Sequence, residues 1–320
     1  MRSVLFKDNQ LELFFSSLDK KKRYLLALSG GPDSTFLFHV LILYKISFIA
    51  AHVDHGWREE SFLEASLLRK LCEEHGISFF CRSIDKKDWG EGDLENVARE
   101  ARYAFFREIC EQEGLSGVFV GHHADDKIET VLKRIFEGAG LASLSGPREL
   151  SYMFSIPVIR PLLHLRKQDI EDKLQRANIS YFFDKTNLED RFLRARMRKS
   201  IIPCIQKKFG KNIVAPLLAL AKDSDELSEY INQESAVYFK EIFRSDAKVS
   251  ITLPVALLQK PFLAKQVIKR FFVMEEMGVS RHTVLAVYQH VVQGTREVSM
   301  RVNGKSIDIS RNTISIRRES

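Results

Sequence analysis

Hydrophobic positions in the first half of the chain predict short strands that alternate with helices. Apolar runs typical of buried strands lie at residues 24–28, 47–53, 77–84 and 117–120. Apolar residues at helical spacing follow these runs, at residues 35–45, 59–75, 94–113 and 125–136. Strands and helices that alternate in this way predict an α/β fold, in which helices cover both faces of a parallel sheet.

The pattern changes near residue 212. A further helix is predicted at residues 168–177, and a basic stretch leads from it toward the second half of the chain. From Val214 onward, apolar residues at helical spacing predict one long helix. We therefore predict two domains, an α/β domain of residues 1–211 and a smaller, mainly helical domain of residues 212–320.

The second domain is predicted to end in strands. Two helices are expected near residues 257–277 and 281–292. Beyond them, apolar and polar residues alternate from Val298 onward, and Asn303-Gly304 is typical of a hairpin turn. This pattern predicts a short β-meander after the helices.

Composition fits an ordinary globular protein, because the 320 residues are 45% hydrophobic and 28% charged. Residues 1–15 lack the basic-then-apolar pattern of a signal peptide, and the longest apolar run is far too short to span a membrane. The four cysteines form no C-x-x-C pair, which argues against disulfide staples and zinc ribbons. We expect a cytoplasmic protein that does not associate with membranes.

Positive charge is concentrated in one segment. The net charge is +7, and residues 191–211 contain eight Lys or Arg and no acidic residue. Such a segment suits the phosphate backbone of a nucleic acid, because charge neutralisation dominates that kind of binding. On charge alone, a solvated helix face is an equally good interpretation.

One loop carries the main candidate chemistry. Between the first predicted strand and its helix lies the sequence Ser29-Gly30-Gly31-Pro32-Asp33-Ser34. Adjacent glycines let the backbone approach an anion closely, and the N–H groups of the following helix N-terminus can donate to it. The two serine hydroxyls add further donors. The loop lacks the Gly-Lys-Ser/Thr of a Walker A sequence, so it is a different kind of phosphate loop.

Asp33 does not suit a simple anion site, because its carboxylate would repel phosphate. It fits if it binds a magnesium ion that bridges to the phosphates. The same six residues would also make a good turn, with Asp33 or Ser34 as a helix cap. We favour phosphate binding because the loop lies between a buried strand and an apolar helix.

This loop resembles the signature of the PP-loop ATP pyrophosphatases, which split ATP into AMP and pyrophosphate and adenylate a substrate oxygen. Further blocks are similar to the lysidine synthetases within that superfamily. They are HVDHG at 52–56, ARY at 101–103, GHHADD at 121–126 with Glu129-Thr130, RPLL at 160–163, and DKTN at 184–187 followed by an Arg-rich run. The chain departs from the family at Ala195, where Asn is common, and at Thr186, where Ser is common.

The resemblance implies a fold, a reaction and a set of partners. The fold is that of the adenine nucleotide alpha hydrolases. In the family, the C2 carbonyl oxygen of the wobble cytidine in a CAU anticodon is adenylated, free lysine attacks C2, and AMP departs. The substrates implied are therefore ATP with Mg²⁺, free L-lysine and the isoleucine tRNA with that anticodon. A homodimer is one option for the assembly.

Candidate site residues follow from the motifs that match. For ATP we assign the six loop residues 29–34 together with His55 and Arg102, and for the metal Asp33. Arg102, Arg194 and Arg196 could stabilise charge that develops on the α-phosphate. We favour Arg194 as the catalytic one because it follows the DKTN block, although each of the three could instead lie on the surface or contact RNA.

The amine substrate requires acidic groups. The ε-amine of lysine has a pKa of roughly 10.4, so it arrives protonated and must lose a proton before it attacks. Asp126 and Glu129 lie three residues apart on one predicted helix face, and we assign both to lysine binding. We assign Asp126 and the preceding His122 to catalysis as well. Asp125 is interpreted as the helix cap and His123 as structural.

The predicted tRNA-binding surface is the basic segment. Its members are Arg191, Arg196, Arg198, Lys199, Lys207 and Lys208. Three other functions are weighed against this one. A tRNA thiolase would be expected to use paired cysteines, an amidotransferase-type synthetase would not need the basic segment, and an inactive RNA-binding module would not need the intact loop.

Overall fold

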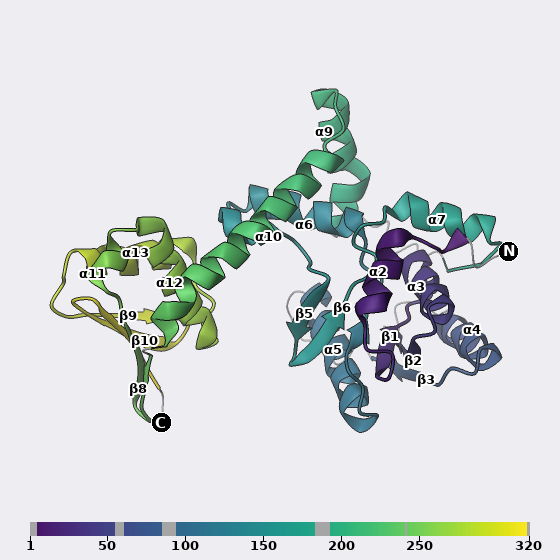
Figure 1. The fold of residues 1–320 in the computed structure, drawn as a ribbon, viewed down its shortest axis with the longest axis horizontal. Coiled ribbons are helices and arrows are strands. Elements are labelled where there is room, and N and C mark those ends of the chain that lie inside the picture. The colour runs from purple at the N-terminus through teal and green to yellow at the C-terminus, as the bar shows by residue number, and fades with distance from the viewer. Residues whose placement is uncertain (1–4, 55–60, 85–93, 183–192, 241, 319–320) are drawn as a thin grey trace. The chain divides into compact units, whose positions relative to one another are not determined.

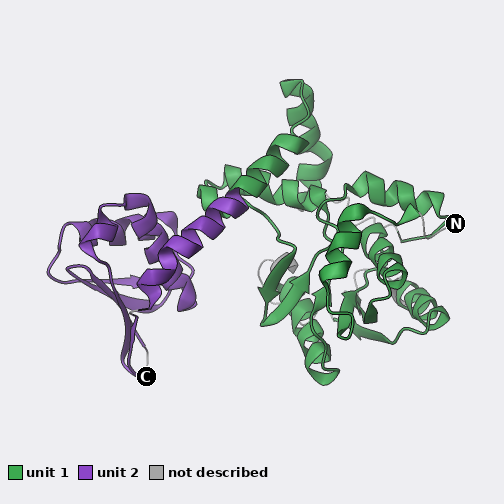
Figure 2. Cartoon of the chain, viewed as in Figure 1, with its two compact units in different colours: residues 1–223 green, residues 224–320 purple. Residues whose placement is uncertain are grey.

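The computed structural model describes residues 5–54, 61–84, 94–182, 193–240 and 242–318 (Figure 1). The chain divides into two compact units, residues 1–223 and residues 224–320 (Figure 2). The boundary falls within the long helix α10 (Val214–Ala236). Each unit has its own sheet and its own hydrophobic core.

A six-stranded sheet forms the centre of the first unit, in the order β3-β2-β1-β4-β6-β5. Its strands are β1 (Arg23–Ala27), β2 (Ser47–Asp54), β3 (Phe79–Ser83), β4 (Val118–Phe119), β5 (Leu150–Met153) and β6 (Ile156–Ile159). Every pair is parallel except β5 with β6 at the edge. The predicted parallel sheet is confirmed, and the β5–β6 hairpin is an addition that the sequence analysis missed.

Helices connect these strands. They are α2 (Asn9–Ser17), α3 (Pro32–Leu43), α4 (Ser61–Glu74), α5 (Leu94–Gln112), α6 (Ala124–Phe136), α7 (Lys167–Arg176), α8 (Leu193–Arg196) and α9 (Ile202–Phe209). Short 3-10 and π turns occur at η2 (Leu141–Ser143) and η4 (Met197–Ile201). The predicted helices correspond to α3 through α7, whereas α2 was not predicted. Among the described residues, no helix is both long enough and apolar enough to cross a lipid bilayer.

Helices cover both faces of the sheet. The side chains of strand β1 accordingly alternate between two hydrophobic cores, one on each face. Leu26 joins a core that contains Phe36 and Phe38 of α3 together with residues of α2 and α7. Leu25 joins the opposite core, which contains Phe106 of α5. Successive side chains of a strand point to opposite faces, so an uninterrupted apolar run satisfies both cores.

The second unit combines helices with a five-stranded antiparallel sheet in the order β7-β8-β11-β10-β9. Its elements after α10 are η5 (Val237–Phe239), β7 (Phe243–Arg244), β8 (Lys248–Thr252), α11 (Val255–Leu258), α12 (Pro261–Met274), α13 (Arg281–Val292), β9 (Val298–Val302), β10 (Lys305–Ser310) and β11 (Thr313–Arg317). The predicted terminal meander is confirmed as β9-β10-β11. Strand β8 extends this meander by pairing with β11. The two strands lie far apart in the sequence, so local sequence patterns do not reveal that they pair.

One glycine sets the distance between the end of β4 and the start of α3. A Cβ atom built on Gly121 would lie 2.9 Å from the Asp33 carbonyl carbon and 3.0 Å from the Ser34 nitrogen. These neighbours are backbone atoms at a helix N-terminus, so they cannot move aside cheaply. The contact brings the residues that follow Gly121 onto the N-terminus of α3.

We expect Gly121→Ala to destabilise the first unit by about 1–3 kcal/mol, because the methyl group must push two segments apart. Urea unfolding of the full chain measures the difference. Gly140→Ala is the matched control, since that position has ordinary φ of −68° and open space around it. Equal stability of the two variants would contradict the close contact.

Candidate active site

The loop between β1 and α3 is organised by the Ser34 hydroxyl. The Ser34 Oγ accepts hydrogen bonds from the backbone N–H groups of Ser29 (3.2 Å) and Gly30 (3.1 Å) and donates to the Gly31 carbonyl oxygen (3.2 Å). Ser29 Oγ lies 3.0 Å from the same hydroxyl. In this structure the Ser34 hydroxyl therefore holds the loop together, and the N–H groups of Asp33 and Ser34 at the start of α3 provide donors for an anion.

Gly30 is fixed by two separate requirements. Its φ of +81° lies in the left-handed region that disfavours side chains. A Cβ atom there would also lie 2.4 Å from the ring of Phe182, whose backbone N–H donates to the Gly30 carbonyl oxygen at 2.8 Å. The chain just before residue 183 therefore packs directly on the loop.

Asp33 lies in the first turn of α3, where Pro32 starts the helix. Its Oδ1 atom is buried and has no hydrogen-bond partner among the described residues. Burial raises the pKa of Asp33, and the nearby charges of His123 and Lys167 oppose that rise. A buried carboxylate oxygen without a donor is costly, so it indicates a place for a cation.

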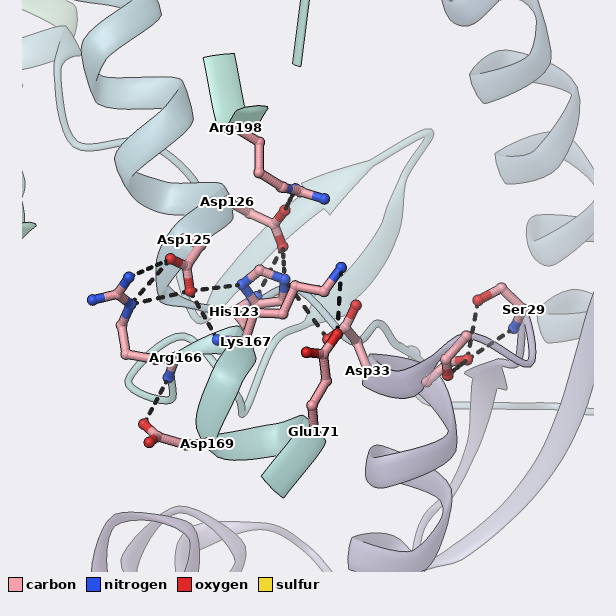
Figure 3. A network of polar contacts seen from close by, with 12 residues as sticks. Ser29, Asp33, His123, Asp125, Asp126, Arg166, Lys167, Asp169, Glu171 and Arg198 are labelled. Carbon is pink, nitrogen blue, oxygen red and sulfur yellow. Dashed lines mark hydrogen bonds and ion pairs between the residues drawn. The ribbon is translucent and has the colours of Figure 1, made fainter. Parts of the chain in front are cut away.

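His123 lies at the centre of the acidic cluster (Figure 3). Its imidazole is 2% exposed; Nε2 is 3.7 Å from Asp33 Oδ1 and 3.6 Å from Asp126 Oδ2, and Nδ1 is 3.6 Å from Asp125 Oδ2. Burial lowers the pKa of His123, but the three carboxylates outweigh burial and raise it above its ordinary value. His123 thus favours the cationic form that balances its neighbours.

Asp125 ties helix α6 to helix α7. Its carboxylate accepts hydrogen bonds from Arg166 Nη2 (2.6 Å) and from the backbone N–H of Lys167 (2.8 Å), the first residue of α7. Burial raises the pKa of Asp125, but His123 and Arg166 lower it far more. The interpretation of Asp125 as the cap of its own helix is wrong, because its carboxylate reaches the next helix instead.

The side chain that caps the start of α6 is that of Asp126, whereas the N-cap residue is His123. The Asp126 Oδ2 accepts a hydrogen bond from the backbone N–H of His123 (3.0 Å), which is the reciprocal half of a capping box. Its Oδ1 lies 3.4 Å from Arg198 Nη2. Burial raises the pKa of Asp126, but the charge of His123 and the capping bond lower it on balance. Asp126 therefore remains ionised while it holds the helix start.

Glu129 lies one turn further along α6 and is 3% exposed. Its Oε1 accepts a 2.7 Å hydrogen bond from Arg198 Nε, whereas its Oε2 is buried without a partner among the described residues. Burial raises the pKa of Glu129 despite the guanidinium. Arg198, expected on the tRNA surface, is therefore engaged with the two carboxylates that we assigned to lysine.

The other predicted site residues lie on several elements. Arg194 and Arg196 are exposed on α8, Lys199 is exposed in η4, and Lys207 and Lys208 are exposed on α9. These residues keep the predicted basic surface. Arg102 lies on α5 and is partly buried. His55, Arg191 and the DKTN block at 184–187 lie outside the described residues.

Two contributors were missed by the sequence analysis. Arg166 and Lys167 lie shortly after the RPLL block and reach the cluster from the start of α7. Lys167 helps to lower the pKa of Asp33. Their position three and four residues after the last residue of a matched motif was the available signal. His123 was interpreted as structural, but it contacts more of the site than His122 does.

Comparison with known proteins identifies the class first. Residues 5–205 match the PP-loop domain family. A U34-tRNA thiolase, NcsA from Methanococcus maripaludis, shares the fold with a TM-score of 0.55 at 19% sequence identity, over 69% of this chain and 76% of that one. The first unit is therefore a PP-loop domain.

Curated relatives then define the family within that class. A tRNA(Ile)-lysidine synthase of Chlamydia felis (strain Fe/C-56) is 44% identical over 98% of this chain and 98% of its own length. Those of Chlamydia pneumoniae and Chlamydia trachomatis serovar A are 46% and 47% identical, each over 90% of both chains. The chain belongs to the tRNA(Ile)-lysidine synthase family.

We expect Arg198→Met to leave the Glu129 carboxylate buried without a guanidinium. Because the folded pKa of Glu129 is raised above 4.5, ionisation costs stability as pH rises through that pKa, and removal of Arg198 enlarges this cost. The variant should be less stable by about 1–3 kcal/mol near pH 8, and the difference should shrink at acidic pH.

Denaturant unfolding across this pH range measures the effect. The double variant Glu129→Gln/Arg198→Met is the matched control, since it lacks the Glu129 carboxylate whose ionisation is tested. A stability loss in Arg198→Met that is the same at every pH would count against the ion pair as its cause.

Proposed function

We propose that this chain ligates free L-lysine to C2 of the wobble cytidine of tRNA(Ile) with a CAU anticodon, consuming ATP and releasing AMP and pyrophosphate. The observation that supports this most is the acidic cluster at the start of α6, which lies directly against the N-terminus of α3. A nucleotide phosphate bound at α3 and an amine bound at the carboxylates would then be neighbours. The tRNA substrate places the reaction in the cytoplasm.

The residues present fit a magnesium ion held jointly with ATP. Among the described residues, no group of three or more His, Cys, Asp or Glu side chains could form a complete metal cage. Mg²⁺ commonly uses one or two carboxylates together with substrate phosphates and water. The unpartnered Oδ1 of Asp33 supplies one such ligand. When bound, the ion would neutralise charge on the phosphates.

Adenylation needs positive charge around the α-phosphate. The N–H groups at the start of α3 and the exposed guanidinium of Arg194 supply it in our proposal. Lys167, which already influences Asp33, adds a second cation from α7. The cytidine C2 oxygen attacks the α-phosphorus, its bond to AMP forms, and pyrophosphate leaves.

Lysine attack needs a protonated amine to bind and then lose a proton. The buried Oε2 of Glu129 is an acceptor without a donor, as an ammonium group would require. The raised pKa of Glu129 also makes it a stronger proton acceptor than an ordinary carboxylate. Asp126 lies beside it and stays ionised, so the two carboxylates divide the roles of binding and proton transfer. The amine nitrogen bonds to C2, and AMP departs with the C2 oxygen.

The thiolase alternative is disfavoured by the cysteines. Cys72 and Cys110 are buried, and burial raises their pKa values to about 12 and about 11. Thiols in that state are poor nucleophiles and poor metal ligands. Cys81 and Cys204 are exposed and lie on separate elements. Sulfur transfer therefore has no paired thiols to use among the described residues.

We expect Asp33→Asn to lower AMP release by about 100-fold or more, because the amide cannot hold the cation that accompanies ATP. Affinity for tRNA should change little. The assay combines purified protein, Mg²⁺, labelled ATP, labelled lysine and unmodified tRNA(Ile), and follows AMP together with label in the RNA. Asp223→Asn, an exposed change on α10, is the control. Full activity of Asp33→Asn would remove the metal assignment, and absence of lysine incorporation by the wild type would remove the function.

We expect Arg196→Gln/Lys207→Gln/Lys208→Gln to weaken tRNA binding at low salt. Each lost phosphate contact should also reduce the slope of log affinity against log salt by roughly one unit. Filter binding between 50 and 300 mM salt measures both quantities. Lys20→Gln/Lys21→Gln changes exposed charge on the α2–β1 connection and serves as the control. An unchanged slope in the triple variant would place the RNA elsewhere.

A further inference from the structure

Arg160 is a buried arginine without an acidic partner among the described residues. It follows strand β6 and is 3% exposed. Its Nη1 donates to Ser151 Oγ (2.7 Å) and to the Arg148 carbonyl oxygen (2.9 Å). These acceptors are neutral, so the positive charge is held by hydrogen bonds alone. A cation buried in this way is costly, and such a cost indicates a specific task.

Another hydrogen bond of Arg160 goes to the site. Its Nε donates to Nδ1 of His122 at 2.9 Å. A guanidinium nitrogen can only donate, so Nδ1 must act as the acceptor and carry no proton. A neutral imidazole keeps one proton, which then lies on Nε2. The contact thus selects a single tautomer of His122.

The surroundings of His122 support the neutral form. Charged groups face it from four elements: Asp126 on α6, Arg160 after β6, Arg99 on α5 and Arg194 on α8. Burial lowers the pKa of His122 most; Asp126 opposes that, the three arginines reinforce it, and the pKa falls to about 4. No described residue accepts a hydrogen bond from Nε2.

We infer that Arg160 is a positioning residue that fixes His122 as a neutral Nε2–H donor, so that His122 donates to a substrate oxygen and is not the proton acceptor of the reaction. This inference rests on the proposed function for the identity of the substrate. The assignment of the His122 tautomer does not depend on the proposed function. Donation to an oxygen that becomes more negative during adenylation would stabilise the transition state. Proton removal from the amine then falls to the carboxylates.

The tautomer can be tested on the free protein. In ¹⁵N-histidine-labelled wild type, His122 should show an unprotonated Nδ1 and a protonated Nε2 that do not titrate between pH 8 and pH 5.5. The signals are assigned among the nine histidines by their loss in His122→Gln. In Arg160→Met the Nδ1 signal should move as pH falls, because the donor and one positive charge are gone. Arg160→Lys should restore the wild-type behaviour in part.

The role can be tested by two substitutions at position 122. A glutamine amide can replace the Nε2–H donor but cannot accept a proton, whereas leucine can do neither. His122→Gln should therefore retain at least about tenfold more lysine-incorporating activity than His122→Leu, since loss of one such donor costs about 10²–10³-fold. Equal loss in both variants, or titration of wild-type His122 near 6.5, would overturn the inference. A wild type with the expected tautomer but no lysine incorporation would instead reject the proposed function alone.

Discussion

The buried imidazole of His123 holds together the candidate active site, and the other elements of the first unit position the residues around it. Asp33, Asp125 and Asp126 come from two different helices and meet around His123. Carboxylates this close repel one another unless a cation lies between them. The backbone contact at Gly121 makes the meeting geometrically feasible, and the raised pKa of His123 makes it electrostatically stable. The loop before α3, the helices α3 and α6 and the sheet therefore constrain one another through the imidazole ring of His123.

Charge balance explains why so many cations surround the acidic residues. Arg166 satisfies Asp125, and Arg198 satisfies Glu129 and part of Asp126. Among the described residues, two buried oxygens of the cluster remain without donors, one on Asp33 and one on Glu129. These oxygens are the two places where we propose that a metal ion and a substrate ammonium act. The protein thus neutralises most of the cluster itself and leaves specific positions for its ligands.

Much of this fold and part of the site could be predicted from sequence. Apolar runs located β1 to β4, and the glycine-rich loop located Asp33, because both signals are local. The β5–β6 hairpin and β8 were missed because strands of only 4 or 5 residues have weak patterns. The link from Asp125 to Arg166 and the ion pair of Arg198 depend on partners 41 to 72 residues away. Spacing along a single helix cannot reveal such partners.

The loop glycine at position 30 has a consequence for how the chain can change over evolutionary time. Shortening Phe182 would vacate the volume that a side chain at position 30 needs. The left-handed backbone at that position would still penalise any residue other than glycine. A smaller residue at position 182 combined with a side chain at position 30 therefore removes the steric clash but leaves the backbone strain. Two substitutions are thus not enough to replace this glycine without cost.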